Sequence, residues 1–515
     1  MTHQELMELA IAEQKKLVMA TRGFRDILNP GDAVKTDTID IAQGLYGYSL
    51  EQPAKQLIPF LPAWVQSLPR NVIGTGNVHQ YKRITGVALT GKSTAAEGAR
   101  GNAASIATDA PTVAMGNLSS GVFNVSIQAQ YAAGTFEDVL ARATTLSLLQ
   151  GRRSETAHIL GGNVTALGAV DSVTGVTTAL STSIAGNLVT GQTYYVYIKQ
   201  LTAMAMQKAI LAQCVQIPAV TTHAVQSVGA LSVNSASVVG IDQTDGYSVE
   251  STVTNSGSAT TGDSLTISWV PSPKAAGYAI FVGSTADGGT GIAKAFLQCV
   301  IGSQANVVLT KYLNTGVAGV TGDNSADAND FPGLLALLNA SGSGAYINAV
   351  SGTLTPDSGN GITQINTMLT SCYLSQLGID EGYLVMGIGE RQNLSRALGA
   401  GTATSIGRYI VNLPGSQDFT GGMHADHYKH PVTGNPIPVV TDVNLSHGMI
   451  LWIPTKIPYI AADVPSPLAM FLNYDWMLLP YAVTAPKREY EAVLRGGLAC
   501  YLPPAFGLLY DIYFG

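Results

Sequence analysis

Charged residues are scarce in this sequence. Asp, Glu, Lys and Arg make up 12% of the 515 residues, about half the share of an ordinary soluble domain. A solitary soluble monomer usually has many charged residues on its surface. We therefore expect that the surface of this chain is either buried against neighbouring subunits or made of Ser, Thr, Asn and Gly. The net charge of −7 argues against a dedicated nucleic-acid reader, which needs a basic patch or stripe. The length predicts two to four domains.

Cysteines and long apolar runs are also few. The four cysteines are isolated, so we expect reduced, buried thiols and neither a disulfide framework nor a metal site. No stretch approaches the length of about 18 apolar residues that a membrane-spanning helix needs. The N-terminus MTHQELMELAIAEQKK carries early acids and no apolar core, so no signal peptide is expected. We expect a chain made in a cytosol, without a membrane partner, that stays soluble or assembles.

The first 70 residues are predicted to form an arm. Residues 3–20 have the apolar spacing of an amphipathic helix, and five prolines interrupt the segment 21–70. An arm has little core of its own and needs a partner surface. We therefore predict subunit contacts for its large apolar side chains, namely Leu6, Leu9, Phe24 and Trp64.

Residues 71–133 are predicted to form a long hairpin, the extended loop. Its strands are VHQYKRITGVAL (78–89) and GVFNVSIQAQYA (121–132), with small residues and turn chemistry between them. Its charged residues include Lys82, Arg83, Lys92, Glu97 and Arg100, which we predict to contact a neighbouring subunit.

Residues 134–165 contain the strongest helix signal, over 135–160. Apolar residues recur at spacings of three and four, Thr135 and Asp138 resemble a capping box, and Gly161-Gly162 end the pattern. Glu155 lies off the apolar stripe, with several arginines. Such a long helix can act as a strut for a flat domain.

Composition changes over 166–325, where Thr, Ser, Val, Gly and Ala dominate. Strands are predicted at 192–201, 264–270, 277–283 and 305–313, with Trp269 and Tyr278 filling a core, so this block is predicted to be an inserted all-β sandwich. From 326 to 515 the pattern is mixed. Helices are predicted at 331–340, 361–377 and 390–398, and strands at 382–389, 437–443 and 449–454, followed by an apolar, strand-like tail at 489–514.

This order of elements resembles the major capsid proteins of tailed bacteriophages, the Hong Kong 97-like family. The resemblance rests on TFEDVLARATTLSLLQGRRSETAHILGG for a spine helix, GITQINTMLTSCYLSQLGIDEGYLVMGIGERQNL for helix–strand–helix, and HPVTGNPIPVV for a strand with its turn. It implies an α+β fold with an N-terminal arm, extended loop, spine helix, and peripheral and axial domains, the last covering 326–515 with the rest of the peripheral domain. The inserted block resembles the immunoglobulin-like domains that some of these proteins carry.

The resemblance implies a structural protein, not an enzyme, that has no cofactor. Copies of the chain would form the hexamers and pentamers of an icosahedral head shell that encloses double-stranded DNA without reading its sequence. Expected partners are a portal, a separate scaffolding protein and a decoration protein, with assembly in the host bacterial cytoplasm and a final place in the virion. Some family members cross-link a loop lysine to an asparagine. Lys92 is the candidate by position, although an ordinary solvated lysine is the favoured alternative.

Three motifs suggest other chemistry. Gly86 to Ser93 matches G-x-x-x-x-G-K-[ST], but its flanks do not fit a buried strand and a helix, so a hairpin tip is favoured over a nucleotide site. The cluster His424, Asp426, His427 and His430 offers metal-ligand chemistry in a loop-like sequence, and a solvated loop is favoured. Gly387-Ile388-Gly389 lacks the third glycine of a dinucleotide turn, which favours a tight strand-to-helix turn.

Rival functions are an encapsulin-like bacterial compartment shell, a secreted β-sandwich adhesin and a P-loop NTPase. The adhesin would explain the middle block but not the spine helix. The NTPase would explain only residues 86–93.

Overall fold

The computed structural model describes residues 62–514, apart from 74–75, 77, 89–96, 99–104, 134–138, 171–175, 220–221, 226–242, 358–360, 376–377, 400–424, 457–465 and 484–485. The chain divides into two compact units. One unit contains Met1–Leu57, Val125–Arg142 and Val483–Arg488, and the other contains the rest. The predicted helix at 3–20, with Leu6, Leu9 and Phe24, lies outside the described residues.

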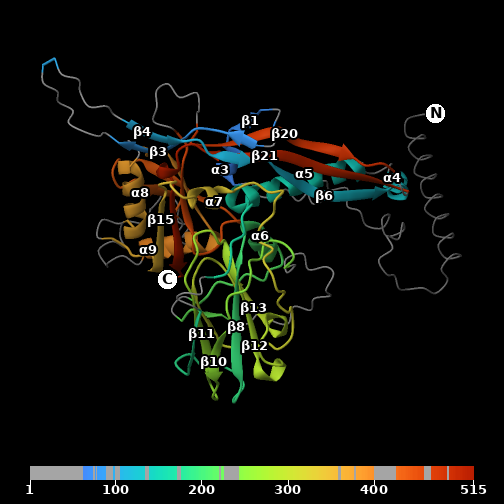
Figure 1. Cartoon of the computed structure of the whole chain (residues 1–515), viewed down its shortest axis with the longest axis vertical. Coiled ribbons are helices and arrows are strands. Elements are labelled where there is room, and N and C mark those ends of the chain that lie inside the picture. Colours follow the sequence, from blue (N-terminus) through green and yellow to red (C-terminus); the bar gives the residue numbers. More distant parts are fainter. Residues whose placement is uncertain are drawn as a thin grey trace, which may run out of the picture. The chain divides into compact units, whose positions relative to one another are not determined.

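Helices and strands are mixed along the chain, which confirms the α+β class (Figure 1). The helices are α3 Ala63–Gln66, α4 Ile127–Ala133, α5 Val139–Gly161, α6 Ala203–Leu211, α7 Leu334–Leu338, α8 Thr363–Ser375 and α9 Ile388–Gly399. The strands are β1 Arg70–Val72, β2 Val78–Gln80, β3 Arg83–Ala88, β4 Ser105–Asp109, β5 Thr112–Ala114, β6 Gly116–Ser126, β7 Thr177–Ser181, β8 Thr193–Leu201, β9 Ala224–Val225, β10 Thr254–Ser258, β11 Ser264–Ser268, β12 Gly277–Ser284, β13 Phe296–Ile301, β14 Asn306–Leu309, β15 Tyr346–Thr353, β16 Gly382–Met386, β17 His427–Lys429, β18 Pro436–Thr441, β19 Ile450–Pro454, β20 Leu468–Pro480, β21 Lys487–Cys500 and β22 Gly507–Tyr513.

A long β-ribbon is built from the two ends of the chain. The strand order is β1-β20-β21-β6, in which β20 and β21 pair antiparallel and β1 pairs parallel with the start of β20. The first of these strands immediately follows the predicted arm, and β20 and β21 come from the last fifty residues. The topology therefore places the root of the arm on a strand that is distant in sequence.

Helix α5 confirms the predicted long helix, and it ends at Gly161 as the Gly161-Gly162 pair indicates. The backbone of Gly162 closes the last turn by donating to the His158 carbonyl at 2.8 Å. A Cβ on Gly162 would lie 2.4 Å from the Phe331 carbonyl oxygen, so only glycine fits there. Glu155, which lies off the apolar stripe of the sequence pattern, is nevertheless buried, at 1% exposure.

The segment predicted as one long hairpin is divided between sheets. Strand β3 pairs with β4, whereas β6 joins β21 in the ribbon. The second predicted strand, 121–132, is half helix, because α4 begins at Ile127. A two-stranded antiparallel hairpin is present within the predicted range, because β2 pairs with β5 and β3 with β4. Its second strand was predicted wrongly, since the partner of β6 lies near the C-terminus of the chain.

A six-stranded sheet has the order β15-β22-β19-β16-β18-β17. Its core includes residues of α8 and α9, such as Met368, Leu369 and Leu394, packed with strand residues such as Trp452. The predicted tight turn at Gly387 is confirmed, because β16 ends at Met386 and α9 begins at Ile388.

The middle block is a sandwich of two four-stranded sheets, β10-β8-β12-β13 and β7-β11-β14-β9, around a shared apolar core. Trp269 and Tyr278 pack edge to face in it, with ring centroids 5.1 Å apart, as predicted. In an immunoglobulin sheet, strand A lies beside B and E beside D. In the β7-β11-β14-β9 sheet, by contrast, no two adjacent strands follow each other directly in the sequence. The likeness to an immunoglobulin domain is therefore limited to the sandwich architecture.

The outer face of the β8-containing sheet packs into a second buried cluster, which the sandwich shares with the rest of its unit. Tyr197, Phe281 and Val300, from the β8-containing sheet, belong to the same buried cluster as Ile159 of α5 and Leu334 of α7. The sheet is thus apolar on both faces, which explains why β12 is buried along its whole length. The sandwich is packed into its unit and is not a lobe on a flexible tether.

Candidate assembly site

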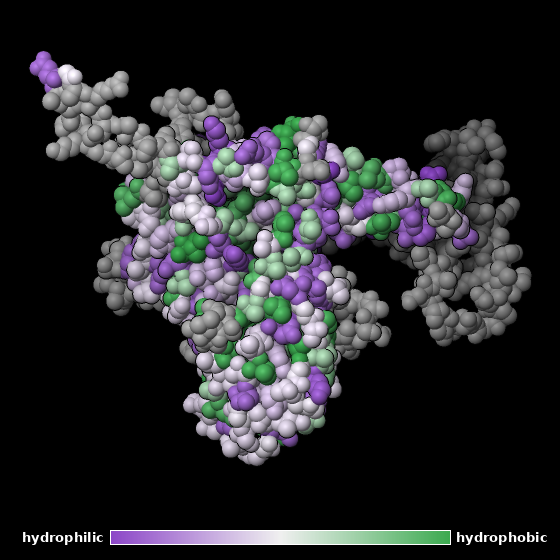
Figure 2. Space-filling view, viewed as in Figure 1, coloured by the Kyte–Doolittle hydropathy of each residue, from purple (hydrophilic) through white to green (hydrophobic). Residues whose placement is uncertain are grey.

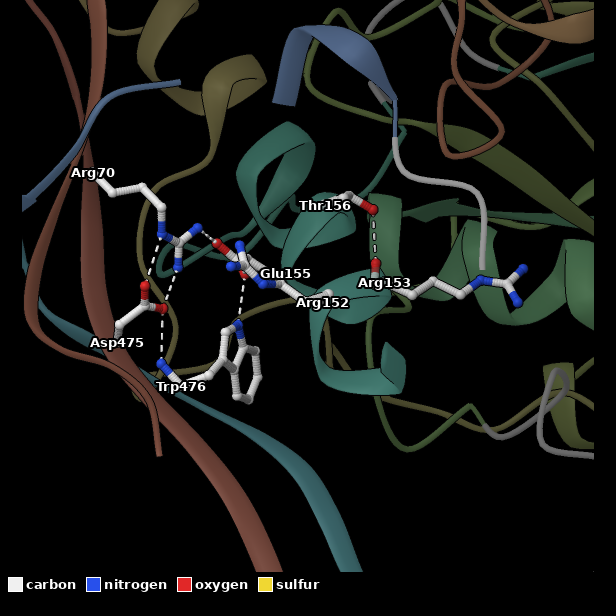
Figure 3. A network of polar contacts seen from close by, with 7 residues as sticks. All are labelled: Arg70, Arg152, Arg153, Glu155, Thr156, Asp475 and Trp476. Atoms are coloured by element: carbon white, nitrogen blue, oxygen red, sulfur yellow. Dashed lines mark hydrogen bonds and ion pairs between the residues drawn. The ribbon is translucent and has the colours of Figure 1, made fainter. Parts of the chain in front are cut away.

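The root of the arm is held by a polar network around Arg70, the first residue of β1 (Figure 3). Its guanidinium binds the Asp475 carboxylate through two hydrogen bonds, Nη2 to Oδ1 at 2.6 Å and Nε to Oδ2 at 3.2 Å. A third hydrogen bond runs from Nη1 to Oε1 of Glu155. One arginine therefore joins β1 to both β20 and the long helix α5.

Glu155 is the buried centre of this network. Its Oε2 accepts a hydrogen bond from the Trp476 indole at 2.7 Å and lies 3.6 Å from Nη1 of Arg152. The Trp476 ring lies against Gly151, one turn earlier on α5, where a Cβ would come within 2.8 Å of the ring. The glycine lets the indole reach the carboxylate, and the indole and arginine compensate for removing a charge from water.

The electrostatics favour the charged forms of Arg70 and Asp475. Burial acts to raise the pKa of Asp475, but hydrogen bonds from Arg70 and the Trp476 amide, together with the charge of Arg70, lower it overall. Burial acts to lower the pKa of Arg70, but Asp475 and Glu155 raise it overall. A charge-assisted bidentate pair has a fixed geometry. The site therefore sets the direction in which the preceding chain leaves β1.

Trp64 corrects a sequence prediction. We predicted it to contact another subunit, but it is 1% exposed within its own chain. Its indole donates to Oδ2 of the buried Asp442 at 2.9 Å, and the Asn444 amide donates to Oδ1 at 2.8 Å. Burial raises the pKa of Asp442. Trp64 packs into a core that is built mostly from other segments of the same chain. The local sequence contains no information about that core.

The same buried region joins two further segments. The Asn444 side chain donates to Oγ1 of Thr156 on α5 and accepts from the Gln207 amide of α6, both at 2.6 Å. The end of the arm, the long helix, the sandwich and the loop after β18 thus meet in one hydrogen-bonded network. The sequence contained no signal for it beyond isolated polar residues.

The root of the β3–β4 hairpin is also fixed. Arg83 lies directly opposite Asp109 across the ladder, and its Nε donates to Oδ1 at 2.9 Å. The hydrogen bond with Asp109 raises the pKa of Arg83. Arg83 is therefore paired within its own chain, which corrects its predicted role as a subunit contact. Lys82 and Glu97 are exposed, and Lys92 and Arg100 lie outside the described residues.

Apolar side chains are exposed along the outer part of the ribbon. Met477, Leu478 and Leu479 are consecutive in β20 and are 40%, 37% and 37% exposed, with Tyr481 at 45% and Val122 of β6 at 54%. Figure 2 shows green, apolar patches on this ribbon. Successive residues of a strand point to opposite faces, so both faces of the ribbon present apolar surface there. Contiguous exposed apolar surface is uncommon on soluble monomers.

In the part of the chain that the structure describes, the motifs that suggested other chemistry form no site. Gly86–Ala88 lie in β3, paired antiparallel with β4, which is not the strand-to-loop geometry of a nucleotide site. Asp426 pairs with Arg391 at 2.8 Å, and Nδ1 of the buried His430 accepts from the Val432 backbone at 3.2 Å. His427 is exposed, and His424 lies outside the described residues. Within the described part of the chain, no group of three or more His, Cys, Asp or Glu residues is placed to hold a metal ion.

The four cysteines are buried free thiols, as expected. None of the helices in the described ranges is long and apolar enough to cross a membrane.

No protein-family model and no curated protein matches the chain. Among solved structures, it is similar to the capsid of an empty GTA particle, at 10% identity and a TM-score of 0.38, over 93% of this chain and 99% of that one. It is also similar to the capsid of the Myoviridae phage XM1, at 9% identity and a TM-score of 0.36, over 93% and 100%. An encapsulin complex from Synechococcus elongatus matches 36% of this chain and 57% of its own, with 13% identity and a TM-score of 0.20.

Proposed function

We propose that the chain is a structural shell subunit, the major capsid protein of a tailed bacteriophage, which closes a container by binding copies of itself. The observation that carries the proposal is the exposed apolar surface on both faces of the ribbon, at Met477, Leu478 and Leu479. No charged residue occurs between Asp475 and Lys487. Exposed apolar surface of this kind is unfavourable for a solitary monomer, whereas an obligate assembly buries it between subunits.

The two fixed roots support the same proposal. Arg70 and Arg83 anchor the starts of two segments, the arm and the β3–β4 hairpin, through bidentate carboxylate pairs. A chain that must present the same segments to many identical neighbours needs a defined exit direction for each. Repeated contacts between identical subunits then add up to a stable shell.

The finer features of the proposal follow from the family resemblance. They are hexamers and pentamers in an icosahedral head, a portal and a separate scaffolding protein as partners, and enclosed double-stranded DNA without sequence-specific contacts. Assembly would take place in the host bacterial cytoplasm, and the mature location would be the virion. The subunit would have no enzymatic role in this scheme.

A compartment shell of the encapsulin type is the alternative within the same class, and it would bury the same ribbon. The adhesin alternative leaves the long helix α5 and its buried Glu155 unexplained. Cargo separates the two shells, because an encapsulin-like shell would enclose protein and a phage head would enclose DNA.

Negative-stain electron microscopy and size-exclusion chromatography of the purified full-length chain test the proposal. We expect shells, capsomers or tubes, alone or after co-expression with a scaffolding protein from the same genome. A monodisperse, stable monomer under both conditions would contradict it.

A further inference from the structure

A second polar cluster lies where the sandwich meets the six-stranded sheet. The turn between β13 and β14, residues 302–305, packs on the loop that precedes β19. Ser303 donates its backbone N–H to the His447 carbonyl at 2.7 Å. The contact is close, because a Cβ on Gly302 would lie 1.9 Å from that carbonyl oxygen. We call this contact the sandwich joint.

Strand β22 forms the other side of the sandwich joint. The Asp511 carboxylate accepts from the Ala305 backbone at 2.8 Å, and the Asp511 backbone donates to Oγ of Ser303 at 3.2 Å. Asp511 has a φ of 55°, in the left-handed region that non-glycine residues rarely adopt. The sheet therefore adopts a strained backbone at the residue that holds the sandwich.

Behind the joint, a carboxyl group and an imidazole face each other without solvent. Glu390 of α9 is 0% exposed and His447 is 6% exposed, and Glu390 Oε1 lies 3.0 Å from Nδ1 of His447. The other contacts of this carboxyl group are neutral donors, the Gly448 amide at 3.1 Å and the Asn393 side chain at 3.2 Å. Neither ring nitrogen of His447 makes a hydrogen bond to any residue that the structure describes, so the Gly448 amide links the carboxyl group to the loop whose His447 carbonyl binds Ser303.

Among the described residues, the charged groups around Glu390 offer no counter-ion. On α9, Arg391 pairs with Asp426, and Arg396 lies over the Phe514 ring at 4.8 Å. Strand β22 contributes Asp511, a second acid. The 302–305 turn contributes no charged residue. Within the described ranges, a negative charge on Glu390 would therefore be buried without a cation in hydrogen-bond contact, which is strongly unfavourable.

We propose that Glu390 is a proton-dependent lock on the sandwich joint. The carboxyl group holds a proton while the joint is closed, and loss of that proton leaves a buried anion beside the 447–448 loop and loosens the contact of residues 302–305 with the sheet. Burial raises the pKa of Glu390 to about 8 and lowers that of His447 to about 4, so the proton lies on Glu390 and is lost above neutral pH. The lock lies within one chain and does not depend on the shell function.

Hydrogen exchange on the full-length chain tests the lock. The readout is the protection factor of the 302–305 backbone, corrected for base-catalysed exchange, at pH 6 and pH 9. We expect a loss of about tenfold in the wild type, since a group with a pKa near 8 is largely ionised at pH 9. Glu390→Gln keeps the shape without an ionisable proton and should show the same protection at both pH values.

Asp511→Asn is the matched control, because it replaces the other buried acid of the joint and keeps the oxygen that accepts from Ala305. It should retain the wild-type pH dependence. Amides of β14, which pair within the sandwich, report on general loosening. Equal pH dependence in the wild type and Glu390→Gln would overturn the proposal, as would a loss of pH dependence in Asp511→Asn alone.

Discussion

The indole of Trp64 donates to the carboxylate of Asp442 at 2.9 Å, across 378 positions of sequence. Both groups are buried, and burial raises the pKa of Asp442. This hydrogen bond fixes the last turn of the arm to the loop after β18. Helix α3 is therefore attached to the body of its own chain at a defined point.

Loss of that donor should destabilise the subunit. In Trp64→Phe the ring remains apolar but Asp442 loses a hydrogen bond, so we expect a decrease of about 1–3 kcal/mol in the free energy of unfolding. Urea unfolding followed by circular dichroism measures it. Val65→Ala, in the same short helix, is the control and should cost less. Equal losses in both variants would mean that the indole hydrogen bond contributes little.

Gly151→Ala should also destabilise the chain, against the helix propensity scale. Alanine in place of a helical glycine usually stabilises by up to about 1 kcal/mol. Here the new methyl group would come within 2.8 Å of the Trp476 ring, so we expect a net loss of about 1–3 kcal/mol. The same substitution in a Trp476→Ala background should recover the ordinary gain. A double-mutant cycle by chemical unfolding measures this coupling.

Arg70→Met tests the root of the arm. The substitution leaves the buried Glu155 with the indole and the more distant Arg152, so we expect a loss of about 1–3 kcal/mol, moderated because Arg70 and Asp475 are partly exposed. Adding Glu155→Gln should restore part of the stability, because the uncompensated charge is then gone. Arg153→Met, one residue beyond Arg152 on α5, is the control. No recovery in the double variant would argue against Glu155 as the centre of the network.

The subunit should lose stability between about pH 6.5 and pH 8. A carboxyl group with a raised folded pKa stabilises the fold at low pH and loses that contribution as pH rises through its folded pKa. His447, with a lowered pKa, has the opposite slope below pH 6.5, so the two groups cancel between about pH 4.5 and 6.5. Above that range only Glu390 changes, which amounts to about 2 kcal/mol. Urea unfolding at half-unit pH steps should show this fall in the wild type and a flatter profile in Glu390→Gln.

Leu478→Asp should block assembly without unfolding the subunit. The side chain is 37% exposed, so a carboxylate there remains hydrated in the monomer but would be buried in a contact between subunits. We expect soluble subunits with a thermal midpoint close to that of the wild type and no shells by electron microscopy. Leu211→Asp, at 50% exposure at the end of α6, is the matched control. Normal shells from Leu478→Asp would remove the ribbon from the assembly surface.

The sequence by itself determined the elements whose signals are local. The spacing of apolar residues and the Gly161-Gly162 pair located α5 and its end, and alternation with turn residues located β8, β11, β12 and β14 of the sandwich. Gly387 marked the strand-to-helix turn because glycine is itself a local turn signal. The structure adds a second reason, since a Cβ at this position would lie too close to the Leu445 carbonyl oxygen. The low share of charged residues led us to predict a chain that completes its packing against neighbouring subunits, which stays a prediction.

Only the tertiary structure decided the rest. Strand β6 pairs with β21, more than 360 positions away, so it could not be recognised as a ribbon strand rather than half of a local hairpin. The burial of Glu155 and Trp64 was not predicted, because it depends on Arg70, Trp476 and Asp442, which come from other segments. Periodicity reports which side of an element is apolar. It does not report which distant donor compensates for removing a buried charge from water, because that stabilisation comes from contacts that exist only after the chain has folded.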